Sequence, residues 1–419
     1  MIKQIIIVFV ALVSLNMTAQ EGSTSPYSFF GIGELKFRGT VENKAMGGLS
    51  IYADSIHLNL QNPASLGKLK LTTFTVGGNQ KFTTLKTDTN EAKGSTTTLD
   101  YLAVGLPMGK LGISFGLMPY TAVGYKTGFV SRLDANVGDG RYQGKGGLNK
   151  VFLAAGYAVN KEFSLGIDAN YSFGKIENEA IYITGVQYDT QEINISRLSG
   201  LAINLGANYQ KMITNELQLI SSLTYSPVAS LTSKNERVTS SIIWNNTSLP
   251  TPVSTQVSDL GALATTKFKL PSKFTIGAGL SQPKKWFAGI DFTTLSTSKL
   301  ENRTFAANNM SFENSTKIAV GGFYIPKYNS LTSYLDRIVY RAGMRFENTG
   351  LIVNNEKIKE FGMSFGVGLP VGRLFSNMNI GVEYGSRGTT KANLVKENFF
   401  NFNLSFSFND KWFQRRKID

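Results

Sequence analysis

The feature that most constrains the fold is the alternation of large apolar and small polar side chains in the last strand-like run, residues 399–409. The apolar positions are Phe400, Phe402, Leu404, Phe406 and Phe408, and the polar positions are Asn401, Asn403, Ser405, Ser407 and Asn409. A period of two predicts a β-strand with one apolar and one polar face. About ten residues is also the length that a tilted strand needs to cross the hydrocarbon layer of a membrane. We therefore expect a membrane-spanning barrel strand whose apolar face meets lipid.

The same alternation recurs along the chain, with connections that alternate in length. Apolar positions alternate with polar or small ones in residues 111–117, 163–172, 201–209 and 378–385. Short links are expected at 108–110, 160–162, 212–215, 283–285 and 371–373, and long polar loops near 88–94, 128–144, 175–196, 233–265, 302–313, 348–357 and 386–396. Short periplasmic turns and long outer loops are typical of outer-membrane barrels. Residues 70–419 are thus predicted to form an all-β, antiparallel transmembrane barrel of about fourteen strands, with twelve or sixteen as alternatives. A large soluble β-sandwich is less favoured, because it requires no such alternation of connection lengths.

The first 69 residues differ from the rest. Residues 1–19 are expected to be a secretory signal peptide, because Lys3 precedes an apolar run and Ala19 offers a cleavage position. No later run reaches the ~20 apolar residues that a spanning helix requires, so a membrane-spanning chain of this kind must be a barrel. Residues 20–69 are rich in turns and too apolar for a disordered leader. We predict that they fold inside the barrel as an N-terminal plug, or hatch.

Composition excludes several classes of site. The 419 residues include no cysteine, which excludes disulfides, thiolate metal sites and an acylated cysteine. The net charge of +14 is better explained by anionic outer-membrane lipid and lipopolysaccharide than by nucleic acid, because the basic residues form no compact patch. The single histidine, His57, precedes the barrel and does not support hydroxyl-based catalysis. We expect neither an enzyme nor a metal or cofactor site.

Several charged and aromatic residues fall on the polar, lumen-facing side of their strands. They are Asp168, Asp291, Arg341, Arg345 and Glu383, together with Tyr101, Phe152 and Phe287. Charges in a lumen are costly unless they are solvated or paired. They are therefore expected to form a network that joins the plug to the wall, with a substrate site as the less favoured alternative. The inward aromatic residues suit a hydrophobic passage or a packed plug.

Three stretches near the N-terminus resemble a known family. They are residues 25–35 (SPYSFFGIGEL), 45–48 (AMGG) and 58–66 (LNLQNPASL). Placed between a signal peptide and a barrel, they resemble the FadL-type outer-membrane transporters. The triplet Asn62-Pro63-Ala64 matches the hatch motif of that family, and only these three residues are carried over.

The resemblance implies passive uptake of hydrophobic compounds, such as long-chain fatty acids, through a fourteen-stranded barrel that is gated by the hatch. It also implies a lateral exit through the wall. Candidate strand irregularities for this exit are Gly77-Gly78, Pro119, Pro227 and Gly321-Gly322.

A second function from a different class is left open by the same resemblance. Related barrels serve as accessory subunits of outer-membrane secretion or assembly machines, including type IX secretion. A possible envelope protein partner could then dock on the long loop at 233–265. The sequence alone does not separate this role from transport.

Overall fold

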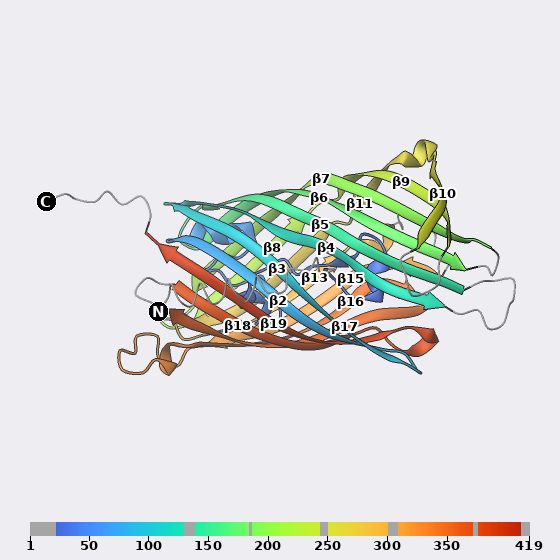
Figure 1. Ribbon diagram of the computed structural model, residues 1–419. Helices are drawn as coiled ribbons and strands as arrows, with labels where there is room; N and C mark the ends of the chain where they lie inside the picture. Colours follow the sequence, from blue (N-terminus) through green and yellow to red (C-terminus); the bar gives the residue numbers. More distant parts are fainter. Residues whose placement is uncertain are drawn as a thin grey trace.

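Fourteen antiparallel wall strands close into a barrel, as the sequence predicts (Figure 1). The computed structural model describes residues 22–129, 139–183, 187–243, 250–300, 309–371 and 376–411, so the expected signal peptide lies outside the described residues. The strands are β2 (Thr72–Lys86), β3 (Glu91–Met108), β4 (Leu111–Phe129), β5 (Asp139–Ala158), β6 (Phe163–Ile183), β7 (Asp189–Met212), β8 (Gln218–Ser226), β9 (Ala229–Ile243), β10 (Thr251–Ser258), β11 (Thr265–Leu270), β12 (Lys273–Gln282), β13 (Trp286–Leu295), β14 (Met310–Phe312), β15 (Ser315–Tyr324), β16 (Val339–Val353), β17 (Glu356–Val371), β18 (Ser376–Arg387) and β19 (Lys396–Asp410). The 3₁₀ turns η3 (Gly261–Ala264), η4 (Thr297–Lys299), η5 (Leu335–Arg337) and η6 (Lys391–Asn393) lie in the connections.

Some wall strands are interrupted, which is why there are more elements than wall strands. Proline interrupts two of them: Pro227 separates β8 from β9, and Pro271 separates β11 from β12. Proline lacks the N–H that a sheet ladder requires, so it breaks the strand at that point. β10 and β11 both pair with β9, and β14 and β15 both pair with β16, so each set forms one wall strand.

The last strand has the predicted facing and closes the barrel. β19 pairs with β2 from Asp410 opposite Thr72 to Lys396 opposite Lys86. Phe400, Phe402 and Phe408 are between 40% and 45% exposed on the outer face. The five polar residues between and beside them, from Asn401 to Asn409, are buried in the lumen.

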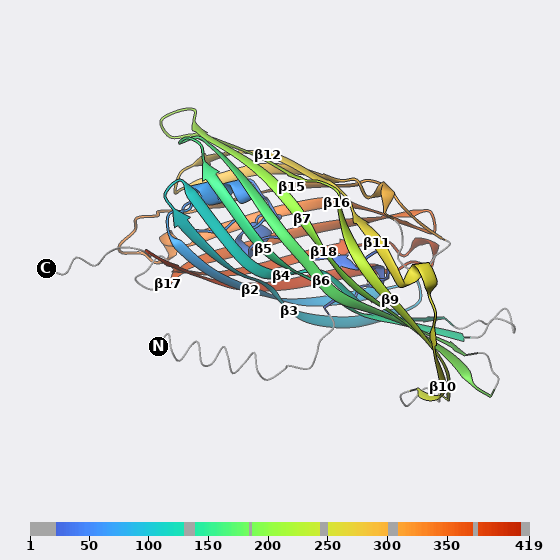
Figure 2. The ribbon, with the colours of Figure 1, turned by 90° about the horizontal axis from the view of Figure 1, so that it is seen from above.

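Several of the predicted long outer loops contain strand, which corrects the sequence interpretation, whereas residues 388–395 form a connection with η6, as predicted. Residues 175–196 were expected to be a loop, but β6 and β7 pair there from Lys175 opposite Arg197 to Tyr182 opposite Thr190. Beyond the hydrocarbon layer water wets both faces of a strand, so the ladder continues without the apolar alternation. Figure 2 shows β9 and β10 extending at this end together with the paired ends of β6 and β7. We call the half of the barrel that carries these extensions the outer half.

Residues 22–71, here called the N-terminal segment, lie inside the barrel (blue in Figure 1). The segment contains η1 (Pro26–Phe29), β1 (Glu34–Leu35), α2 (Val41–Lys44) and η2 (Pro63–Lys68). Its apolar residues Val41, Leu58 and Leu66 are buried in one cluster with Tyr101 and Phe152 of the wall. The hydrophobic core of this molecule therefore lies between the segment and the wall. Within the described part of the chain, no helix is long and apolar enough to span a membrane.

We predict that Leu404→Lys destabilises the folded barrel by about 2–4 kcal/mol, because Leu404 faces lipid midway along β19. The matched control is Val257→Lys in β10, which is 64% exposed but lies in the projecting strand extension. Urea unfolding in bilayers, followed by heat-modifiable gel migration, measures both variants. Equal loss of stability in the two variants would contradict the assignment of the lipid-facing belt.

Candidate functional site

Asn62, Pro63 and Ala64 anchor the N-terminal segment to the wall. The Asn62 side chain caps η2, because its Oδ1 accepts a hydrogen bond from the Ala64 backbone N–H at 3.0 Å. Its Nδ2 donates to Ser222 Oγ at 2.8 Å and to the Ala207 carbonyl at 3.1 Å. One side chain thus fixes both the local turn and its position on the wall.

A row of wall glycines makes room for this turn. Gly112, Gly156, Gly166 and Gly206 lie directly opposite one another across β4, β5, β6 and β7. A Cβ at Gly166 would lie 2.3 Å from the Ala64 nitrogen, and a Cβ at Gly206 would lie 2.1 Å from Asn62 Oδ1. Only glycine permits so close an approach of two backbones. The sequence interpretation missed this row, although glycines at inward positions were a visible signal.

Gly321 and Gly343 form a second close contact, with the backbone of Met46. A Cβ at Gly321 would lie 2.4 Å from the Met46 carbonyl oxygen. Strand pairing is continuous here, since Gly321 and Gly322 both pair with β13 and with β16. Gly321-Gly322 is therefore a seat for the segment, and the suggestion that it marks an opening in the wall is wrong.

Three of the predicted inward residues form an ion pair or hydrogen bonds with the segment. Asp168 forms an ion pair with Arg38. Asp291 accepts hydrogen bonds from the Ser50 backbone N–H at 2.6 Å and from Ser50 Oγ at 2.7 Å. The Tyr101 hydroxyl accepts from the Val41 N–H at 3.1 Å.

The other five predicted residues also point inward. The two aromatic residues pack against the segment, and the three charged residues pair with polar side chains. Phe152 packs against the leucines of the segment, and Phe287 lies 5.0 Å from the Tyr52 ring, measured between centroids. Arg341 donates to Asn379 at 3.0 Å, and Asn379 donates in turn to Glu42 of the segment at 2.8 Å. Arg345 and Glu383 form an ion pair with each other.

Arg345 and Glu383 belong to a larger ion-pair network that sequence reasoning did not find. Glu34 of β1 is at its centre, 2.9 Å from Lys81 and 3.0 Å from Arg387, and Glu360 bridges Arg387 and Arg345 at 2.5 Å from each. Burial alone would raise the pKa of the Glu34 carboxyl. Lys81, Lys36 and Arg387 outweigh burial and hold that pKa well below its usual range. The Glu34 carboxyl thus lies among three cationic side chains between the segment and the wall.

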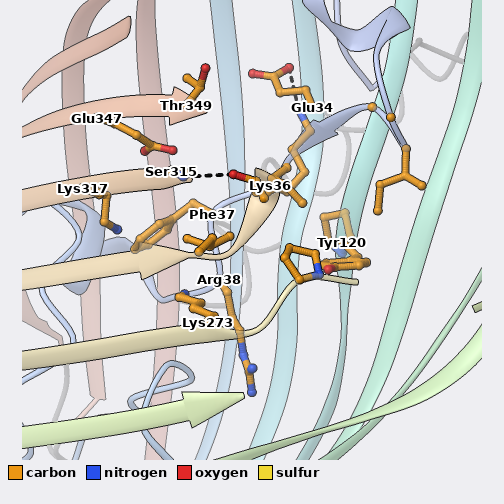
Figure 3. Close-up of a pocket in the computed structure, with 18 of the residues that line it drawn as sticks. Glu34, Lys36, Phe37, Arg38, Tyr120, Lys273, Ser315, Lys317, Glu347 and Thr349 are labelled. Atoms are coloured by element: carbon orange, nitrogen blue, oxygen red, sulfur yellow. Dashed lines mark hydrogen bonds and ion pairs between the residues drawn. The ribbon is translucent and has the colours of Figure 1, made fainter. Parts of the chain in front are cut away.

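A cavity of about 420 Å³ lies between the segment and the outer half of the wall. Figure 3 shows Lys273, Lys317 and Glu347 of the wall on the side of the cavity next to Phe37 and Arg38. The lining is apolar in part, as the side chains of Phe37, Leu270 and Leu295 indicate. It is also strongly charged, and two of the predicted inward charges, Arg345 and Glu383, are among its lining residues.

The wall is incomplete between β3 and β4 in the outer half. The two strands pair only from Leu102 opposite Leu117 to Met108 opposite Leu111. Beyond that, within the described residues, β3 pairs with β2 and β4 pairs with β5, and β1 of the segment pairs with the free edge of β4. A Cβ at Gly22 would lie 2.9 Å from Ala122 Cβ, and a Cβ at Gly94 would lie 2.9 Å from Thr24 Cγ2. The first described residues of the segment thus contact both edges of the gap.

His57 has a local role. Its Nδ1 lies 2.6 Å from Asp54 Oδ2, and Asp54 Oδ1 also accepts from the backbone N–H groups of Ile56 and His57. Burial would lower the pKa of His57, but the Asp54 carboxylate raises it above its usual value. The pair stabilises a turn of the segment.

The fold is similar to that of several solved outer-membrane proteins. The chain superposes on the toluene transporter TbuX of Ralstonia pickettii with a TM-score of 0.61 at 14% identity, covering 89% of this chain and 99% of that one. The toluene transporter TodX of P. putida gives 0.62 at 14% identity over 90% and 100%. A FadL homologue of Pseudomonas aeruginosa gives 0.57 at 11% identity over 91% and 99%. The fold is that of FadL-like outer-membrane channels and indicates an outer-membrane location.

The family is defined by a second comparison. The BamG family model matches residues 1–419, and the chain belongs to the BamG family. No curated protein sequence matches the chain significantly.

We predict that Gly206→Ala loosens the segment, because the added methyl group would displace Asn62 from its seat on the wall. Limited proteolysis within residues 22–71 should then be faster than in the unaltered protein. Gly381→Ala is the matched control, since a Cβ at this inward position meets nothing closer than 3.5 Å. Equal protection of the two variants would show that the seat does not hold the segment.

Proposed function

We propose that this protein is a passive outer-membrane channel for hydrophobic compounds, in which the N-terminal segment acts as a hatch. The observation that carries the proposal is the position of the cavity. Its lining includes Met118 and Tyr120 from the free edge of β4, and Thr98 and Asp100 from the facing part of β3. The cavity therefore reaches both edges of the gap in the wall.

The gap would serve as the lateral exit. An apolar molecule that passes from the cavity into the bilayer avoids the free-energy cost of crossing water. In the described structure this route is filled by residues 22–36, which pair with β4 and contact β3. Transport then requires displacement of these residues. Of the irregularities considered in the sequence, Pro119 lies at this gap, at a register shift between β4 and β5.

The test of this route is a reversible tether across the gap, in the variant Thr24→Cys, Gly94→Cys. A Cβ at Gly94 would lie 3.1 Å from Thr24 Cβ, so a small shift gives the ~3.8 Å separation of a disulfide. The chain has no native cysteine to interfere. We expect oxidation to abolish uptake of a labelled long-chain fatty acid by cells, and reduction to restore it.

The single-cysteine variants are the controls for this tether, because neither can close the gap. Full uptake by the oxidised double variant would rule out the β3–β4 route.

A second candidate is an accessory subunit of an outer-membrane assembly machine, and the match to the BamG family favours it. The hairpin of β9 and β10 offers a docking surface, since Val253 and Val257 are 49% and 64% exposed. The central residues of the predicted docking loop, 244–249, lie outside the described residues. Extraction in mild detergent followed by mass spectrometry should recover a stoichiometric protein partner if this role holds. Recovery of the chain alone, from cells that show barrel-dependent uptake, would exclude it.

A further inference from the structure

The charges that line the cavity are unbalanced. Among the described lining residues, nine are basic and five are acidic. The basic residues are Lys36, Arg38, Lys44, Lys81, Lys150, Lys273, Lys317, Arg345 and Arg387, and the acidic ones are Glu34, Asp100, Glu347, Glu360 and Glu383. The cavity is therefore an electropositive compartment inside a low-dielectric wall.

The ion-pair network around Glu34 accounts for most of these cations. Lys36, Lys81, Arg345 and Arg387 pair with Glu34, Glu360, Glu383 and Glu397. Lys44 lies 3.8 Å from Asp100, and Arg38 pairs with Asp168 behind the cavity. Three lining lysines from β5, β12 and β15 are left over: Lys150, Lys273 and Lys317.

No described residue forms an ion pair or hydrogen bond with the side chains of these three lysines. Lys150 is only 7% exposed, and its Nζ lies 4.0 Å from the centroid of the Tyr120 ring. Lys150 is in electrostatic range of Arg38 and Lys273, and Lys273 is in range of Lys317. Lys150 and Lys317 thus each repel Lys273 in this part of the cavity.

Nearby acidic groups compensate for this repulsion only in part. Glu347 lies opposite Lys317 in the β15–β16 register, but the two do not approach within ion-pair distance. Asp291 is held by Ser50 of the segment and does not line the cavity. Lys150 is buried and Lys273 and Lys317 are partly buried, and enclosed charges without ion-pair partners are costly. A bound anion would remove that cost.

We propose that this three-lysine site binds a phosphomonoester carried on an apolar chain. This inference rests on the proposed channel function and names the class of its ligand. A carboxylate would neutralise one of the three lysines, whereas a phosphomonoester brings close to two negative charges and three acceptor oxygens. Phe37, Leu270, Leu295 and Leu300 line the same cavity and would contact the chain.

The experiment compares four probes on the purified full-length protein in amphipol at pH 7, by isothermal titration calorimetry. The probes are dodecyl phosphate, dodecanoate, dodecanol and inorganic phosphate. We expect dodecyl phosphate to bind about tenfold or more tightly than dodecanoate, which corresponds to about one additional charged contact. Inorganic phosphate should bind more weakly than dodecyl phosphate, because it has no chain to bury.

Variants test the assignment to these lysines. Lys273→Met and Lys317→Met should each weaken dodecyl phosphate binding about tenfold and leave dodecanol binding unchanged. Lys273→Arg, which keeps the charge, should retain binding. Lys267→Met is the matched control, because Lys267 is an exposed lysine of the neighbouring β11 that does not line the cavity. Heat-modifiable migration verifies that each variant is folded.

The outcomes separate this inference from the channel proposal. Equal binding of dodecyl phosphate and dodecanoate, or unchanged binding in both methionine variants, would overturn the phosphomonoester site and leave a hydrophobic channel intact. Inorganic phosphate binding as tightly as dodecyl phosphate would overturn the amphiphilic ligand. Failure of every probe that carries a chain would count against both proposals together.

Discussion

The structure depends on the docking of the N-terminal segment against the inner wall. A barrel of fourteen strands encloses more space than inward side chains can fill, and many of those side chains are polar here. The segment resolves both problems. Its apolar residues form the core with Tyr101 and Phe152, and its backbone and polar groups pair with inward residues such as Asp291 and Ser222. The glycine rows let the two surfaces approach to backbone contact. The segment therefore fills the lumen of the wall, and the wall provides the apolar and polar partners of the segment.

The same segment also completes the wall. Backbone groups at membrane depth need partners, because the bilayer core offers no water. Where β4 separates from β3, β1 pairs with its free edge at Thr121 and Ala122, and the Lys36 N–H donates to the Tyr120 carbonyl at 2.9 Å. Filling the lumen and sealing the gap are thus properties of one stretch of chain. A movement of the segment away from β4 would therefore also disturb the packing of the interior.

Much of the fold followed from the sequence, because a barrel wall obeys a local rule. Side chains alternate between lipid and lumen along each strand. The facing of Phe400 and Asn401 can therefore be predicted from the sequence without any tertiary information. The same parity pointed Asp168, Glu383 and Phe287 inward. The sequence does not mark where a strand leaves the hydrocarbon layer. Residues 175–196 were predicted as a loop because a strand that is exposed to water on both faces loses its alternation of apolar and polar residues. The ion pairs of Glu34 were also out of reach, because its partners Lys81 and Arg387 are distant in sequence. Lys150 and Lys317 share the inward parity of Phe152 and Ala319, so the lysine site was accessible to the same rule.

Arg38 connects the cavity to the docking of the segment. It belongs to the segment, pairs with Asp168 of the wall, and donates from Nε to the Leu60 carbonyl at 2.9 Å. It is also repelled by Lys150 and Lys273. An anion bound among the lysines would add attraction for Arg38 where there is now repulsion, and would strengthen the docking on this side of the barrel. Release of the segment would then have to begin elsewhere. The β3–β4 gap is a suitable place for release to begin. There the free edge of β4 can hydrogen-bond to any extended chain that replaces β1.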